Sequence, residues 1–307
     1  MALIPHTVKL NDGNEQIPAI GFGTGSALFG KDARDYVVQA IDTGFSHIDT
    51  AQIYSNEDSV GEAIRETGLA REDIFVTTKY ASGAIQDTIR TSLNKLGLKY
   101  VDLYLIHFPT VVQGNFEGAW REFERIKEDG LARSIGVSNF NIEQLQEIIK
   151  VAKIKPAVNQ IRFHPYNYAE NKSLLEYAAK HNIIIEAYSS LSPITKFPGG
   201  PVDAPVNTAA KRLGITATQV ILAWVKAKGV VIVTTSSRKQ RLQEYLAVAD
   251  LPPLTNEEIA AIDEAGAQGP PATPLRKRLT RGAVLFAAAC GAYALYASGL
   301  RYACASV

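Results

Sequence analysis

The sequence predicts an α/β protein built as a (β/α)8 TIM barrel, with an N-terminal β-hairpin before the barrel and an apolar helical tail after it. Eight short apolar runs alternate with eight segments of helical spacing along the chain. Strands that alternate with helices at intervals of about 25–30 residues are typical of βαβ units in a parallel sheet. Eight such units favour a closed barrel over an open, doubly wound sheet with the same alternation.

The first expected element is the hairpin at residues 8–20, with Asn11, Asp12 and Gly13 as its turn. A further helix is expected at 255–266, after the eighth unit, and glycine ends five of the helical segments, as a left-handed C-cap favours (Gly44, Gly68, Gly97, Gly130 and Gly229). The expected strands are 19–23, 47–49, 74–78, 101–107, 134–138, 157–161, 183–189 and 230–235. The expected helices are 33–44, 59–68, 84–97, 116–130, 141–152, 172–181, 217–229 and 238–248.

The end of the chain differs in composition from the barrel. The barrel domain is expected over residues 1–267, followed by a Pro/Gly and basic linker at 268–281, an uncharged apolar run at 282–300 and a short terminus at 301–307. A bilayer core needs about 20 mostly apolar helical residues, so 282–300 is just long enough to be a transmembrane helix. We therefore expect a single-pass C-terminal anchor in the mitochondrial outer membrane or endoplasmic reticulum, with the barrel in the cytosol. The alternatives are a helix packed over the barrel mouth, a disordered extension, and a soluble cytoplasmic protein.

Charge and cysteine content exclude some functions. The formal net charge of +1, with acids and bases interspersed, gives no basic face, so no nucleic-acid partner is expected. Cys290 and Cys304 are the only two cysteines and lie in the tail. The barrel therefore has no disulfide and no thiolate metal site, no metal is expected, and a reducing compartment is the simplest prediction.

Four polar residues are expected at one end of the barrel. Asp49, Lys79 and His107 end the second, third and fourth strands, and Tyr54 lies in the loop after the second. Active sites of such barrels lie at the carboxyl ends of the strands. Singly, the residues could be a helix cap, a solvated rim lysine or a core histidine. Together they form a device for proton delivery to a carbonyl: an ammonium lowers the pKa of a tyrosine, a carboxylate holds the ammonium, and an imidazole donates a hydrogen bond to the substrate oxygen.

Six segments, at 44–64, 74–80, 101–109, 134–141, 157–166 and 185–193, resemble the successive signatures of the aldo-keto reductase superfamily, in its order and within residues 15–265. The resemblance implies reduction of aldehydes or ketones to alcohols with NADPH. In it Tyr54 is the general acid, Lys79 lowers its pKa, Asp49 orients Lys79, and His107 positions the carbonyl. Two alternatives remain: an alcohol dehydrogenase acting in the oxidative direction, and a membrane-tethered, redox-sensing regulatory barrel.

The resemblance also implies a cofactor site. Ser138, Asn139 and Gln160 would bind the carboxamide and Tyr188 would stack on the nicotinamide, while Thr24, Ser189 and Leu191 complete this part of the site. Thr235, Ser236 and Ser237 precede an expected helix, whose N-terminus favours a phosphate, and Arg238 and Arg241 add positive charge. Glu244 matches the acid that holds the adenine. Thr235 stands where the family commonly has lysine, so NADPH is expected, with Arg238 partly replacing that lysine, and NADH remains possible.

The substrate pocket is expected to be wide and shallow. Gly25 stands where many relatives have tryptophan, Phe108 replaces another frequent tryptophan, and the loop at 110–118 is short. Fewer aromatic walls mean less discrimination by packing. In the phosphate loop and the short loops, the chain is similar to fungal reductases of conjugated polyketones and α-keto amides. The partner is then a small-molecule carbonyl substrate, and many relatives imply a monomer.

Overall fold

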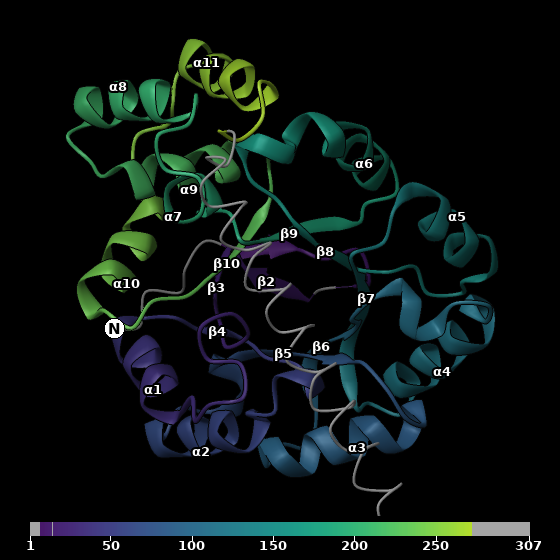
Figure 1. The fold of residues 1–307 in the computed structure, drawn as a ribbon. Coiled ribbons are helices and arrows are strands. Elements are labelled where there is room, and N and C mark those ends of the chain that lie inside the picture. Colours follow the sequence, from purple (N-terminus) through teal and green to yellow (C-terminus); the bar gives the residue numbers. More distant parts are fainter. Residues whose placement is uncertain (1–6, 14, 272–307) are drawn as a thin grey trace, which may run out of the picture. The chain divides into compact units, whose positions relative to one another are not determined.

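A computed structural model of the protein describes residues 7–13 and 15–271, and one compact unit ends at Gly269. Eight parallel strands close into a barrel in the order β10-β3-β4-β5-β6-β7-β8-β9, and helices surround it (Figure 1). The closure is direct, because β10 pairs with β3 from Ile232 opposite Ile20 to Thr234 opposite Phe22. The predicted (β/α)8 barrel is confirmed.

The hairpin consists of β1 (Thr7–Lys9) and β2 (Gln16–Pro18). The barrel strands are β3 (Ile20–Gly23), β4 (His47–Asp49), β5 (Phe75–Tyr80), β6 (Val101–Ile106), β7 (Ala132–Ser138), β8 (Val158–Arg162), β9 (Ile184–Tyr188) and β10 (Val231–Thr234). The α-helices are α1 (Arg34–Thr43), α2 (Glu57–Thr67), α3 (Ile85–Leu96), α4 (Phe116–Glu128), α5 (Ile142–Val151), α6 (Tyr168–Lys180), α7 (Ser192–Thr195), α8 (Asp203–Leu213), α9 (Ala217–Ala227), α10 (Lys239–Leu246) and α11 (Asn256–Ala267). The short 3-10 helices are η1 (Gln52–Tyr54), η2 (Arg71–Asp73), η3 (Pro109–Val112), η4 (Pro165–Asn167) and η5 (Ala247–Ala249).

The predicted N-terminal hairpin is confirmed, and it covers the beginning of several barrel strands. Leu10 and Ile17 are buried in one cluster with Phe75, Val158 and Val231, the first residues of β5, β8 and β10. Burial of these side chains removes apolar surface from water, which stabilises the hairpin on the barrel. The amino ends of the strands are therefore sealed by apolar packing, and the polar residues gather toward the carboxyl ends.

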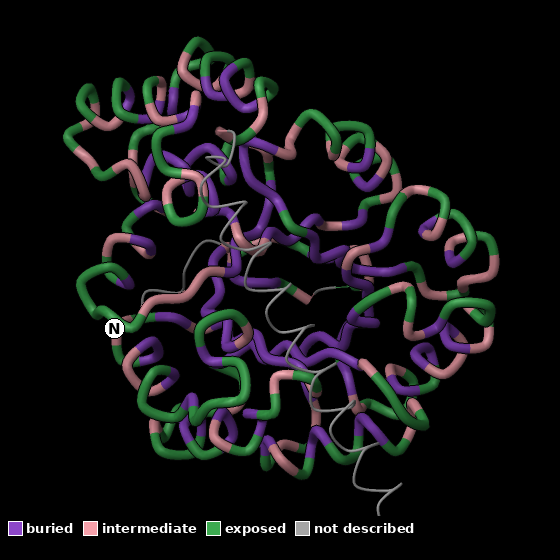
Figure 2. Tube along the Cα trace, viewed as in Figure 1, coloured by how far each residue is buried: buried purple, intermediate pink, exposed green. Residues whose placement is uncertain are grey.

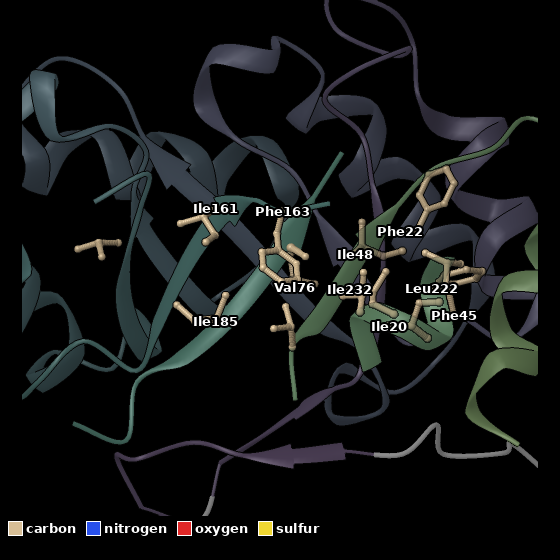
Figure 3. Packing of buried hydrophobic residues seen from close by; sticks show 14 of the residues in the cluster. Ile20, Phe22, Phe45, Ile48, Val76, Ile161, Phe163, Ile185, Leu222 and Ile232 are labelled. Atoms are coloured by element: carbon tan, nitrogen blue, oxygen red, sulfur yellow. The ribbon is translucent and has the colours of Figure 1, made fainter. Parts of the chain in front are cut away.

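A second apolar layer lies between the barrel and its helices. Ile20, Ile48 and Ile232 from neighbouring strands pack in one cluster with Leu222 of α9 (Figure 3). The strands are buried along the barrel, whereas the helices expose their outer sides (Figure 2). This is the pattern expected of helices that bury one stripe against a sheet. Apolar packing therefore stabilises the barrel both in its interior, at the hairpin end, and on its outer surface, against the helices.

Helix ends follow local sequence signals. Asn141, Thr216 and Thr255 form capping boxes at the starts of α5, α9 and α11, where a side chain accepts the free N–H three residues on. The glycines expected to end helices all have positive φ angles, from 64° at Gly68 to 118° at Gly44. Glycine adopts this conformation at no steric cost, which explains its position there.

The sequence did not predict α7 or α8, both of which lie between β9 and β10. The segment before and into α8 is rich in proline and glycine, a composition typical of loops. Pro205 is the third residue of α8, however, and the first turn tolerates proline because its N–H groups have no partner within the helix. The helix is then completed by the apolar residues Val206 and Ala209, which are buried.

The prediction of a membrane-spanning helix is contradicted by the described helices. Across residues 7–13 and 15–271, no helix is both long and apolar enough to cross a bilayer. The run at 282–300, on which the predicted transmembrane helix and anchor depended, lies outside the described residues, as do the terminus at 301–307 and most of the linker. Length and composition alone had suggested the span.

Replacement of Gly266 by alanine is expected to destabilise the protein. A Cβ at this position of α11 would lie 2.2 Å from the backbone oxygen of Pro165 in η4, so one element must shift. We expect a loss of about 1–3 kcal/mol in the free energy of unfolding, measured by urea denaturation. Alanine favours a free helix over glycine, so an unchanged or raised stability would contradict the packing described. Glu264→Ala, at an exposed position of the same helix, is the control and should change stability by less than about 0.5 kcal/mol.

Candidate active site

The register of β4, β5 and β6 brings the predicted catalytic residues to one end of the barrel. Asp49 is the last residue of β4 and lies opposite Thr77 of β5, while Lys79 of β5 lies opposite Leu105 of β6. His107 directly follows β6 and donates its backbone N–H to the carbonyl of Tyr80. Alternate residues of a strand face the same side, so His107 faces the same side as Leu105, the register partner of Lys79. Lys79 and His107 therefore point into the barrel from adjacent strands.

Lys79 and Asp49 form a buried ion pair. The Lys79 Nζ atom lies 2.6 Å from Asp49 Oδ1 and donates a second hydrogen bond to the Thr50 carbonyl at 2.9 Å. The side chains are 0% and 3% exposed. Burial is the largest single influence on Lys79 and opposes its charge, but the attraction of Asp49, together with Tyr54 and Glu186, exceeds it, so the pKa of Lys79 is raised above its ordinary value. The lysine is therefore cationic at neutral pH.

Tyr54 approaches this pair from η1. Its hydroxyl lies 3.5 Å from Lys79 Nζ, and its ring lies edge-on to that of His107 with centroids 5.5 Å apart. Gln52 anchors η1, because its Oε1 accepts the backbone N–H groups of Ala81 and Ser82 at 2.8 and 3.1 Å. The chain then turns sharply at Ser55, which has a φ of 55°. The loop therefore holds the phenol over the ammonium group.

The pKa of Tyr54 differs from the sequence-based expectation. Burial raises the pKa of this phenol, and the opposing effect of the Lys79 ammonium is the second influence. The pKa is therefore above its ordinary value, rather than below it as expected from the lysine alone. A sequence shows which charges can approach a group but not how far it is desolvated. Tyr54 is consequently protonated at neutral pH and can act as a proton donor.

His107 is neutral at the same pH. Burial, together with the nearby Lys79 ammonium, lowers the pKa of His107 to about 3. The ring stacks on Phe108 with centroids 4.3 Å apart and an interplanar angle of 11°. A neutral imidazole can donate one hydrogen bond without bringing a second cation beside Lys79.

The predicted carboxamide-binding residues lie on the neighbouring strand ends. Ser138 ends β7, and its hydroxyl donates to the backbone carbonyl of Gln160 at 2.8 Å. Asn139 donates through Nδ2 to the His107 carbonyl at 3.1 Å, and its Oδ1 accepts the Tyr188 hydroxyl at 2.7 Å. Gln160 Nε2 donates to Asp49 Oδ2 at 2.8 Å. One hydrogen-bonded network thus joins these residues to Asp49 and His107.

Backbone strain marks the same end of the barrel. Ser55, Asn139 and Ser189 have φ angles of 55°, 63° and 61°, and each follows a predicted site residue, namely Tyr54, Ser138 or Tyr188. Non-glycine residues rarely adopt this region, and those that do often cluster at functional sites. Leu191 lies two residues beyond Ser189, half-buried, at the start of α7.

The residues predicted to bind the adenosine phosphate form a second group after β10. Thr235 and Ser236 are half-buried, whereas Ser237, Arg238 and Arg241 are exposed around the start of α10. Ser236 Oγ accepts the backbone N–H of Arg238 at 3.1 Å. Glu244 is half-buried in α10, and its backbone carbonyl accepts from Gln219. The first turn of α10 contains no acidic residue, so this helix start is positive.

The remaining predicted residues, Thr24, Gly25 and Phe108, lie around Tyr54. Thr24 is fully buried, with its hydroxyl 3.2 Å from the Asp49 carbonyl and 3.3 Å from Asn56 Oδ1. A Cβ on Gly25 would lie 2.7 Å from Tyr54 Cζ, so glycine permits the observed position of the phenol. Phe108 is 36% exposed beside His107.

Three buried residues of this region were not identified from the sequence. Asn56 donates to the carbonyls of Thr24 and Leu28, both at 3.0 Å, and so fixes the loop that contains Gly25. Glu186 of β9 accepts from Gln160 Nε2 at 2.7 Å, and His47 of β4 lies 3.7 Å from Glu186. Alternation along each strand could have placed His47 and Glu186 inside the barrel, because they share a face with Asp49 and Tyr188.

Comparison with known proteins agrees with this arrangement. Residues 19–196 and 200–267 match the aldo/keto reductase family. An aldo-keto reductase of Mycolicibacterium vanbaalenii is 42% identical over 268 residues, covering 85% of this chain and 92% of that protein. The NADPH-dependent alpha-keto amide reductase of Saccharomyces cerevisiae is 38% identical over 286 residues, covering 85% and 91%. The crystal structure of a Bombyx mori aldo-keto reductase in complex with NADP has a TM-score of 0.79 at 32% identity, covering 86% and 93%.

Lys79→Met is expected to lower stability strongly, because it leaves the Asp49 carboxylate buried without its cation. Breaking one partner of a buried pair typically costs about 3–5 kcal/mol, and urea denaturation would measure the loss. Glu66→Ala is the matched control, since the Arg34–Glu66 pair has the same kind of contact, 2.7 Å, but with side chains 45% and 46% exposed. We expect a change below about 1 kcal/mol there. Equal losses in the two variants would contradict the burial described for Lys79.

Proposed function

The chain belongs to the aldo/keto reductase family, and from this premise we propose that it reduces aldehydes or ketones to alcohols with NADPH, using Tyr54 as the proton donor. Two contacts in a row support this most directly. The Tyr54 hydroxyl lies 3.5 Å from Lys79 Nζ, and Lys79 Nζ lies 2.6 Å from Asp49 Oδ1. His107 lies beside the phenol at the same end of the barrel. These four residues give a carbonyl oxygen both a proton donor and a neutral hydrogen-bond donor.

The residues around this group fit the nicotinamide end of NADPH. The side-chain nitrogen of Gln160 donates hydrogen bonds to Asp49 and Glu186. The side-chain oxygen of Gln160 is therefore left to accept from another donor, such as a carboxamide N–H. The Tyr188 ring is half-buried and held through its hydroxyl by Asn139, so it can stack on a flat ring. The proposed site also includes Ser138, Ser189 and Leu191 beside these residues.

The positive start of α10 fits the phosphate end. Serine hydroxyls and free backbone N–H groups at a helix N-terminus bind anions, and guanidinium groups form bidentate hydrogen bonds with phosphate. Ser236, Ser237, Arg238 and Arg241 supply these groups, and Glu244 is placed one helical turn on for the adenine. The yeast relative named as NADPH-dependent supports the same cofactor.

The chain's own residues then account for the proton transfer. When bound, NADPH supplies a hydride to the carbonyl carbon. His107 donates a hydrogen bond to the carbonyl oxygen and orients it toward Tyr54. Tyr54 releases its proton to that oxygen as negative charge develops on it. Lys79 stabilises the phenolate that remains, and Asp49 keeps the lysine in place.

The substrate side is proposed to accept carbonyl compounds with apolar substituents of varied size. Gly25 offers no side chain, and the exposed apolar residues near Tyr54 are Phe29, Ile53 and Phe108, at 51%, 42% and 36% exposure. Phe29 lies 6.0 Å from the Tyr54 ring, centroid to centroid. An open apolar surface discriminates weakly between substituents, since one methylene is worth only about 1–3 kcal/mol.

Tyr54→Phe is expected to abolish turnover while leaving NADPH binding within about twofold. Loss of a general acid lowers rates by about 10²–10⁴-fold, whereas the phenol ring stays in place. NADPH oxidation would be followed with a panel of aldehydes, diketones and α-keto esters, and NADP reduction with the matching alcohols. Tyr36→Phe, on the exposed side of α1, is the control. Full activity in Tyr54→Phe would refute the proposed mechanism.

Arg241→Ala is expected to raise the KM for NADPH by about 10- to 100-fold and to change the KM for NADH much less. A charge-assisted hydrogen bond to phosphate is worth about 1.5–3 kcal/mol, and NADH lacks the phosphate concerned. Steady-state kinetics with both cofactors would measure the two values. Lys211→Ala, an exposed cation on α8, should leave both unchanged. Equal effects on NADPH and NADH would place the phosphate elsewhere.

A further inference from the structure

A buried carboxyl group lies beneath the site and takes no part in the proton transfer described above. Glu186 in the middle of β9 is 0% exposed, and its Oε2 accepts a hydrogen bond from Gln160 Nε2 at 2.7 Å. The same nitrogen donates to Asp49 Oδ2 at 2.8 Å. One amide group therefore bridges two acidic side chains in the interior of the barrel.

The side chains around Glu186 provide one cation, Lys79, which already pairs with the Asp49 carboxylate. The titratable groups facing Glu186 are His47 and Asp49 of β4 and Lys79 of β5, while its register partner on β10 is the apolar Val231. The ammonium group of Lys79 lies on Asp49. His47 is neutral, because burial lowers its pKa to about 4. An ionised Glu186 would thus be a buried charge without a cation of its own, which is costly.

The same geometry fixes the orientation of Gln160. Both neighbours of its Nε2 atom are acidic oxygens that accept hydrogen bonds, so the NH2 group faces them and the carbonyl oxygen faces away. Removal of either acceptor would leave an amide hydrogen without a partner inside the barrel and allow the side chain to turn.

We propose that Glu186 is a positioning residue, whose neutral carboxyl group holds Gln160 against Asp49 with the carbonyl oxygen of Gln160 directed to the cofactor. Only the direction of the Gln160 oxygen toward the cofactor rests on the proposed use of NADPH. Burial, with the Asp49 charge as the second cause, raises the pKa of Glu186 to about 8, in agreement with a protonated group at pH 7.

The protonation state has a consequence for stability. A carboxyl group whose pKa is higher in the folded protein than in the unfolded chain binds its proton more tightly when folded. Its stabilising contribution is complete below the ordinary pKa of 4.5 and is lost as the pH rises through about 8. Glutamine has nearly the same shape, accepts the same hydrogen bond and cannot ionise, so Glu186→Gln should lack this loss.

The first experiment compares thermal unfolding of wild type, Glu186→Gln and a control between pH 5 and pH 9, without cofactor. We expect the midpoint of wild type to fall by at least about 5 °C relative to Glu186→Gln over this range. Glu124→Gln is the control, because Glu124 is also buried, at 3% exposure, but binds Arg121 and the backbone N–H groups of Lys153 and Ile154. Parallel curves for wild type and Glu186→Gln would overturn the neutral state.

The second experiment measures NADPH binding at pH 7 by fluorescence titration. Glu186→Leu removes the acceptor and should weaken binding by about tenfold, and Glu186→Gln should recover most of that loss. Equal weakening in both variants, or none in Glu186→Leu, would overturn the positioning role. If Glu186→Leu does not fold, the pH dependence of Glu186→Gln decides. Absence of carbonyl reduction by wild type would refute the proposed function but would leave the unfolding result valid.

Discussion

The buried contact between Lys79 and Asp49 is the constraint on which the rest of the site depends. At 2.6 Å and almost without exposure to water, the pair needs further hydrogen bonds to offset its desolvation. Thr50 and Gln160 supply those contacts, and Gln160 in turn requires Glu186. The hydrogen bonds around this one charged pair therefore join residues of four strands, β4 and β5 with the pair itself and β8 and β9 with Gln160 and Glu186. The same pair keeps a cation next to Tyr54, where negative charge develops in the proposed reaction.

The barrel makes this arrangement possible because its two ends differ. The hairpin and the first residues of several strands seal one end with apolar packing, which supplies hydrophobic stabilisation. Tyr54, Lys79 and Asp49 lie toward the other end, where the strands finish, whereas the buried His47, the first residue of β4, and Glu186, in the middle of β9, lie deeper in the barrel. Small residues give them room: a Cβ on Gly21 would lie 2.6 Å from His47 Nδ1, and one on Gly25 would meet Tyr54. The absence of a side chain at Gly21 of β3 and at Gly25 in the following loop therefore leaves space for His47 and Tyr54.

Much of this could be predicted from the sequence, and the failures have physical causes. Periodicity predicted all eight barrel strands, and strand-end position placed Asp49, Lys79 and His107 together. The sequence missed α8, because Pro205 in a proline- and glycine-rich segment indicates a loop. It identified Lys79 as lowering the pKa of Tyr54 but missed the larger, opposite effect of burial, since desolvation depends on packing. Glu186 was read only as a strand residue, because its contact with Gln160 requires the register of β8 and β9. The span at 282–300 was inferred from composition, which contains no information about packing.

In the proposed reaction, Tyr54 transfers its proton to a carbonyl oxygen during reduction by NADPH, with Lys79 and Asp49 aligned behind it. The most direct test is the stoichiometry and solvent isotope effect of the wild-type reaction with an α-keto ester. We expect one alcohol formed for each NADPH consumed, with slower turnover in heavy water because the phenol proton is transferred. Binding of NADPH without carbonyl-dependent oxidation, or reduction at the same rate in both solvents at every pH, would contradict the proposed reaction.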